Sequence, residues 1–190
     1  MTTAPPAAGF PRDCALIEVH VSDLKQLFNS LDPTPFQERD IDPEAEKFIL
    51  GWAREARSKV PLGLLVHVDQ EAAPDDAETK VHTAVRDHFK RRAHTTRQKL
   101  RDLFKLGRRS LLIGLAFLAA CFALGDVIQM WLPDNRVAGF VRESLLIGGW
   151  VAMWKPIDVF LYQWWPLRAE AVLSDRLSAM VVRVTSSRAR

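Results

Sequence analysis

Cysteine is scarce in this 190-residue sequence, and recognisable catalytic patterns are absent from it. Its two cysteines, Cys14 and Cys121, lie in a soluble segment and in an apolar run, so we expect no disulfide between them, as in a reducing compartment. The sequence contains no nucleophile elbow, phosphate-binding glycine loop, dinucleotide-binding turn or zinc-binding HExxH helix. We therefore predict that the chain is not an enzyme and has no catalytic, cofactor-binding or metal-ligating residue.

A secretory signal is also missing, because residues 1–12 are small and proline-rich without an apolar core, and we expect them to be a disordered leader.

Charge is segregated along the chain. Residues 1–89 carry 9 Lys/Arg against 16 Asp/Glu, whereas residues 90–109 carry 9 against 1. An acidic part, a basic collar and an apolar remainder favour a protein of the membrane surface over one that binds nucleic acid.

A small α/β cytoplasmic domain is predicted for residues 13–74. Apolar residues alternate with others over 14–21 and again over 62–68, as in half-buried strands. Ser22 can cap a short helix over 23–30, and Pro43 begins a second helix that runs to about residue 58. With the next helix, the order is β-α-α-β-α, an α+β domain whose two strands are parallel because helices join them. Two strands leave open edges, so we expect a homo-oligomer.

A long basic amphipathic helix at the membrane surface is predicted for residues 75–109, capped by Asp75 or Asp76. Its charged face is interpreted as a basic collar that faces the lipid and binds anionic head groups. This basic collar consists of Lys90, Arg91, Arg92, Arg97, Lys99, Arg101, Lys105, Arg108 and Arg109.

Two transmembrane helices follow, over residues 110–132 and 144–167, with a periplasmic turn at 133–143 and a cytoplasmic tail at 168–190. Each is long enough to cross a hydrocarbon layer of about 30 Å at about 1.5 Å per residue. The second contains charged residues and Pro156, so a kinked or half-buried helix is the alternative. Lys/Arg residues concentrate before the first span and after the second, which predicts both termini on the cytoplasmic side of a bacterial inner membrane.

Polar residues inside these spans are Asp126, Gln129, Lys155 and Asp158. A charge at membrane depth costs at least a few kcal/mol and needs a partner. We therefore predict one intramembrane polar cluster that locks the two helices together. The alternative is an ion or proton path through an oligomer.

The five histidines offer two candidate metal sites. His82, His88 and His94 recur every six residues, and because such steps rotate them around a helix, they cannot share one face. His20 and His67 lie on the polar faces of the two predicted strands, with Glu18 nearby. If the strands pair, these three become neighbours, although a solvated sheet face is the simpler interpretation.

Two stretches resemble a group of uncharacterised bacterial two-span membrane proteins. The first is the LFNSLDPTPF segment at 27–36 with Glu38–Asp42 after it; the second is GWVAMWKP at 149–156 with FLYQWWP at 160–166. The resemblance implies the two-span architecture for the whole chain, and because the group has no assigned activity, it adds nothing about chemistry.

The favoured function is that of a non-enzymatic, membrane-anchored, oligomeric interaction or scaffold protein. Its expected partners are anionic lipids, further copies of itself and a protein at the acidic N-terminal domain, but not nucleic acid, and no cofactor is expected. The alternative is a small ion- or proton-conducting or transport subunit that uses the polar residues of the spans.

Overall fold

The computed structural model describes residues 10–11, 13–29, 40–57, 60–69, 77–133 and 135–186. They belong to two compact units. The first, which we call the α/β unit, combines residues 1–95 with 170–190; the second, which we call the hairpin, comprises residues 96–169. The predicted leader, apart from Phe10 and Pro11, and the predicted cap at residues 75–76 lie outside the described residues.

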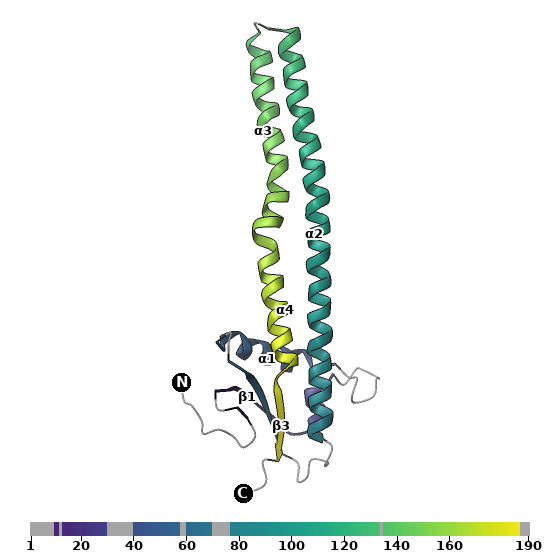
Figure 1. Ribbon diagram of the computed structural model, residues 1–190, viewed down its shortest axis with the longest axis vertical. Coiled ribbons are helices and arrows are strands. Elements are labelled where there is room, and N and C mark those ends of the chain that lie inside the picture. The colour runs from purple at the N-terminus through teal and green to yellow at the C-terminus, as the bar shows by residue number, and fades with distance from the viewer. Residues whose placement is uncertain are drawn as a thin grey trace. The chain divides into compact units, whose positions relative to one another are not determined.

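A three-stranded parallel sheet forms the centre of the α/β unit (Figure 1). Strand β2 (Leu62–Val68) lies between β1 (Ala15–Val21) and β3 (Val181–Ser186) and pairs in parallel with both. The mixed α/β class and the parallel pairing of the first two strands are confirmed. The predicted order omits β3, which comes from the segment expected to be a tail.

The chain between β1 and β2 contains two helical segments, and an aspartate caps the start of each. The first is a single 3₁₀ turn, η1 (Leu24–Leu27), shorter than predicted, and its cap is Asp23 rather than Ser22, because the Asp23 side chain accepts from the Lys25 backbone N–H. Helix α1 (Pro43–Glu55) begins with the predicted proline, and Asp42 accepts from the N–H groups of Glu44 and Ala45.

The core of the α/β unit lies on one face of the sheet. Alternate strand residues point into it, and they meet α1, the first turns of α2 (Ala77–Trp131) and the last turns of α4 (Trp164–Ser178). The central members are Ile17, Leu64, Val66, Val182, Ile49, Val85, Phe89 and Leu177. Because residues before and after the hairpin share this core, the α/β unit is discontinuous in sequence.

In the hairpin, α2 packs against α3 (Arg136–Asp158), a π-helical segment η2 (Val159–Gln163) and α4 (Figure 1). Helix α3 begins at Arg136 rather than at residue 144, because Asn135 caps it by accepting from the Val137 N–H. Pro156 lies inside α3 and lacks an N–H, and the wider π turn follows three residues later.

Small residues line the contact between the helices of the hairpin. A Cβ added to Gly149 would lie 2.6 Å from Leu118 Cδ1, and one added to Gly114 would lie 3.3 Å from the Ala152 carbonyl oxygen, so glycine permits this close approach. The buried small residues are Gly107, Gly114, Cys121, Gly125, Ala138, Gly149 and Pro156. Such packing is typical of helices that associate in lipid.

Two helical segments, Glu78–Trp131 and Arg136–Ser178, are long and apolar enough to cross a membrane. Large apolar side chains are exposed around the hairpin rather than buried in it, among them Ile113, Phe117, Phe140, Trp150 and Trp154. A soluble protein rarely exposes so large an apolar surface, whereas a lipid-embedded one does.

Candidate functional site

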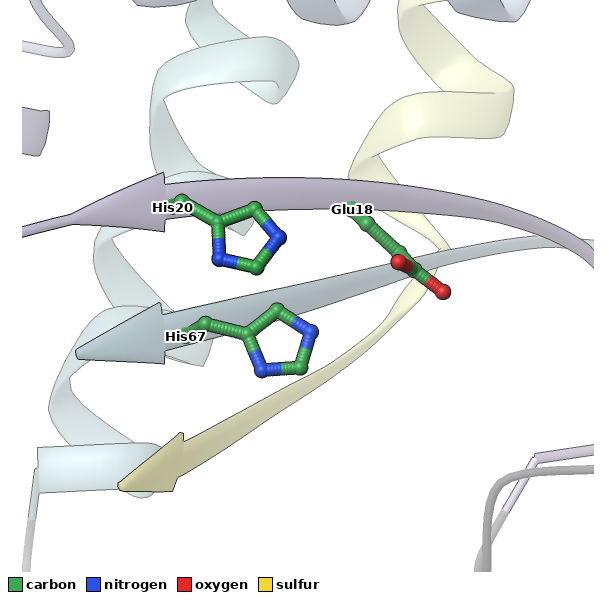
Figure 2. Close-up of side chains that lie close together, drawn as sticks. All are labelled: Glu18, His20 and His67. Atoms are coloured by element: carbon green, nitrogen blue, oxygen red, sulfur yellow. The ribbon is translucent and has the colours of Figure 1, made fainter. Parts of the chain in front are cut away.

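Glu18, His20 and His67 gather on the face of the sheet opposite the core (Figure 2). The register pairs His20 on β1 with His67 on β2, and Glu18 lies two residues before His20 on the same face. One potential ligand atom from each side chain lies within 4.8 Å of the other two. From the sequence, these residues were expected to be neighbours only if the two strands pair, and the observed register brings the three together.

The two imidazole rings stack, with centroids 4.4 Å apart and planes 10° from parallel. Figure 2 shows one nitrogen of each ring on the side of the Glu18 carboxylate. Within the described part of the chain, no lysine or arginine forms an ion pair with Glu18. The nearest candidate in register, Arg183, is held instead by Glu78 at 2.8 Å.

Strand β3 adds a residue that sequence reasoning missed. Thr185 is the register partner of His67, and its Oγ1 lies 3.0 Å from His67 Nδ1. When Nδ1–H donates to this hydroxyl, the lone pair of Nε2 is left free on the other side of the ring. The only signal for Thr185 was the β-branched run at 181–185, which predicts a strand but not its neighbour.

The opposite end of this sheet face is apolar. A Cβ on Gly63 would lie 2.6 Å from the Phe10 ring and 2.9 Å from Cys14 Sγ, so these two side chains lie directly over the strand. Burial raises the pKa of the Cys14 thiol, so the thiol is a poor nucleophile and a poor metal ligand. The chemistry on this face therefore rests on the carboxylate and the two imidazoles, which could hold a metal ion.

The predicted basic collar divides between the two units. Arg92 donates to Glu46 on α1 and, at 2.8 Å, to Glu170 on α4, so it ties helices of the α/β unit together instead of facing lipid. Arg91 pairs with Asp40 at 2.8 Å. His88 lies beside the same network, with Nδ1 3.2 Å from Asp40. Arg91 above all, and His88 with it, lower the pKa of the Asp40 carboxyl against a smaller opposing effect of desolvation.

The remaining collar residues on the hairpin are exposed; they are Arg97, Lys99, Arg101, Lys105, Arg108 and Arg109. Lys90, in the α/β unit, is exposed as well. Aromatic side chains cluster beside the hairpin residues: Phe104 lies 6.2 Å from Phe160 and 6.4 Å from Trp164, ring centre to ring centre. The Arg168 guanidinium lies 5.8 Å from the Trp164 ring centre. Basic and indole groups side by side are typical of a membrane interface.

The polar residues predicted to form one cluster are held at two separate levels of the hairpin. Asp126 pairs with Arg142 at 3.6 Å, near the turn between the helices. Asp158 pairs with Lys155 at 4.0 Å and accepts from Gln163 at 2.5 Å. Gln129 is exposed. The structure therefore brings Lys155 and Asp158 together, but not Asp126.

The antiparallel register explains this separation. Gly125 packs on Arg142, whereas Gly114 packs on Met153 and Gly107 on Val159. Lys155 therefore lies opposite residues near 112, about 14 residues from the level of Asp126, or roughly 21 Å along the helix. The earlier start of α3, at Arg136, produces this offset.

No known protein family, no curated protein and no solved structure matches the chain. The resemblance to a group of bacterial two-span membrane proteins therefore stays a prediction.

Proposed function

We propose that the chain is a non-enzymatic, oligomeric interaction protein, anchored in the bacterial inner membrane by its hairpin, with the α/β unit in the cytoplasm. The observation that carries this proposal is the discontinuous α/β unit. Strand β3 follows the hairpin in sequence yet pairs with β2, which precedes it. Both flanks of the hairpin must therefore lie on the same side of any membrane that it crosses, and the excess of Lys/Arg on these flanks favours the cytoplasmic side.

Anionic lipids are the expected first partner. The exposed basic residues at 97–109 lie beside the aromatic cluster of Phe104, Phe160 and Trp164. Near an anionic surface, each Lys or Arg contributes roughly 1 kcal/mol, and salt screens this attraction. Arg91 and Arg92 are not included, because they pair inside the α/β unit, and Lys105 on the hairpin is itself paired with Asp102 at 2.9 Å.

Self-association is supported by what the sheet leaves uncovered. Parallel sheets are usually covered on both faces, whereas here the helices of the described residues pack on one face only. In addition, β1 and β3 each have a single neighbouring strand within the described part of the chain, so their outer edges offer backbone groups to another chain. A second copy of this chain, or a protein partner at the same acidic unit, could complete either surface.

Ion conduction lacks a comparable observation. A conduction path needs polar groups that follow one another closely through the membrane, but Asp126 and Lys155 lie roughly 21 Å apart along the hairpin, each beside an opposite charge. The pair of Asp126 with Arg142 joins α2 to α3 and favours a role in holding the hairpin together, whereas Lys155 and Asp158 pair within one helix.

Reporter fusions test the proposed topology. A reporter that is active only outside the cytoplasm should stay inactive when fused after Arg190 and become active when inserted at the turn next to Asn135. The protein should also remain in the membrane pellet after carbonate washing. Activity of the fusion after Arg190, or release by carbonate, would refute the proposal.

A further inference from the structure

We infer that Glu18, His20 and His67 form a binding site for a divalent transition-metal ion, with Zn²⁺ as the representative ion. From the sequence alone, a solvated sheet face is the simpler interpretation here. The structure adds three facts that such a face does not require: the register of the two histidines, the position of Glu18 without a basic partner among the described residues, and the hydrogen-bonding distance between His67 and Thr185.

Binding an ion requires the ligand atoms to approach one another and the two stacked rings to turn, because rings within 10° of parallel direct their nitrogen lone pairs side by side. Bonds of about 2.0–2.1 Å in a tetrahedral site place the ligand atoms roughly 3.4 Å apart. The largest separation among the present ligand atoms is 4.8 Å, so the side chains must approach one another by about 1.4 Å at most. Glu18 and His20 are exposed and His67 is half-buried, so all three have room to change rotamer, while the paired strands hold their backbones.

The donor set selects the class of ion. Two imidazole nitrogens and one carboxylate oxygen suit zinc, cobalt or nickel, whereas magnesium and calcium prefer all-oxygen sites. Three protein ligands on an exposed face leave the fourth position to water or to a ligand from another molecule. The site is therefore an open one, and it lies on the face of the sheet that no helix of the described residues covers.

Thr185 acts as a positioning residue for this site. Its hydroxyl can accept from Nδ1–H of His67, which fixes the tautomer with Nε2 as the ligand atom. Loss of such an outer partner typically lowers metal affinity about 10- to 100-fold. We therefore expect Thr185→Val to weaken binding while leaving all three ligands in place.

The test uses the full chain in detergent, purified without a polyhistidine tag and stripped of metal with a chelator. Co²⁺ is titrated while its visible absorption bands are recorded, and Zn²⁺ is then added as a competitor. The variants are His20→Gln, His67→Gln and Thr185→Val, with His94→Gln as the matched control, because His94 is an exposed histidine of the same unit.

We expect Co²⁺ bands in the wild type and in His94→Gln, displaced by Zn²⁺ but not by Mg²⁺. Affinity should fall at least tenfold in both ligand variants and about tenfold or more in Thr185→Val. In the wild type itself, Zn²⁺ should shift the side-chain nitrogen resonances of two of the five histidines, which keeps the test independent of how variants fold. Absence of Co²⁺ bands in the wild type would overturn the inference, as would equal affinity in the wild type, His20→Gln and His67→Gln.

Discussion

Leu177→Ala tests whether residues that follow the hairpin stabilise strands that precede it. Leu177 is fully buried in α4 and belongs to the same core as Leu64 of β2. Truncating a buried leucine to alanine costs about 2–5 kcal/mol, because apolar contacts are lost and a cavity remains. A domain has only about 5–15 kcal/mol of stability, so this loss is large. At about 1.4 kcal/mol per factor of ten, the open population of the α/β unit should rise roughly 30-fold to several-thousand-fold.

Amide hydrogen exchange of β2 is the suitable assay, because β2 is the central strand and lies far from Leu177 in sequence. Exchange of the β2 amides in the full chain should accelerate by the same factor. Val172→Ala is the control, since Val172 is on the same helix but 52% exposed, and it should change exchange little. Equal β2 exchange in the two variants would show that the C-terminal segment is not part of one cooperative unit, and the reasoning would fail.

Three further outcomes are expected. Gly149→Leu should destabilise the hairpin by about 1–3 kcal/mol in detergent unfolding, whereas Gly148→Leu should not, because nothing lies within 4 Å of a Cβ at Gly148. Arg142→Met should destabilise the hairpin in the same assay, because it leaves the Asp126 carboxylate without its partner, and adding Asp126→Asn should restore much of the lost stability. No recovery in the double variant would argue against an ion pair that stabilises the hairpin. The pKa of the Asp40 carboxyl is lowered by folding, so its contribution to the free energy of unfolding is complete above its ordinary pKa of 3.8 and disappears as the pH falls through the lower folded value. Asp40→Asn should therefore reduce the loss of stability at acid pH, measured as the free energy of unfolding against pH.

The elements with a strong local pattern were predictable from the sequence. The alternation over 15–21 and 62–68 located two strands, and the proline at residue 43 located the start of α1. Strand β3 was missed because its short β-branched run is interrupted by Arg183 and followed by polar residues, and because its partner strand lies far away in sequence. A pattern within six residues can indicate a strand, but it contains no information about which distant strand pairs with it.

Only part of the candidate site could be predicted, because the sequence indicates the faces of the strands but not which residues they bring together. Period-two alternation placed His20 and His67 on polar strand faces, but whether they meet depends on register, which pairing decides. The error at Asp126 has the opposite origin. Arg142 resembles the border of a span, although it lies inside α3, which begins at Arg136 with Asn135 as its cap, and this difference shifts the register of the whole hairpin.

The position of β3 in the chain has a consequence for biogenesis. His67 and Thr185 lie 118 residues apart, so a ribosome that adds about 5–20 residues per second reaches the partner of β2 roughly 6–24 s after β2 itself. During that interval the edge of β2 that later receives β3 is available to wrong partners. On the proposed topology, the chain must also cross the membrane and return before β3 can dock. Completion of the sheet would then occur only in molecules whose hairpin has been threaded correctly, and a misinserted chain would present an unfinished sheet to cytoplasmic proteases.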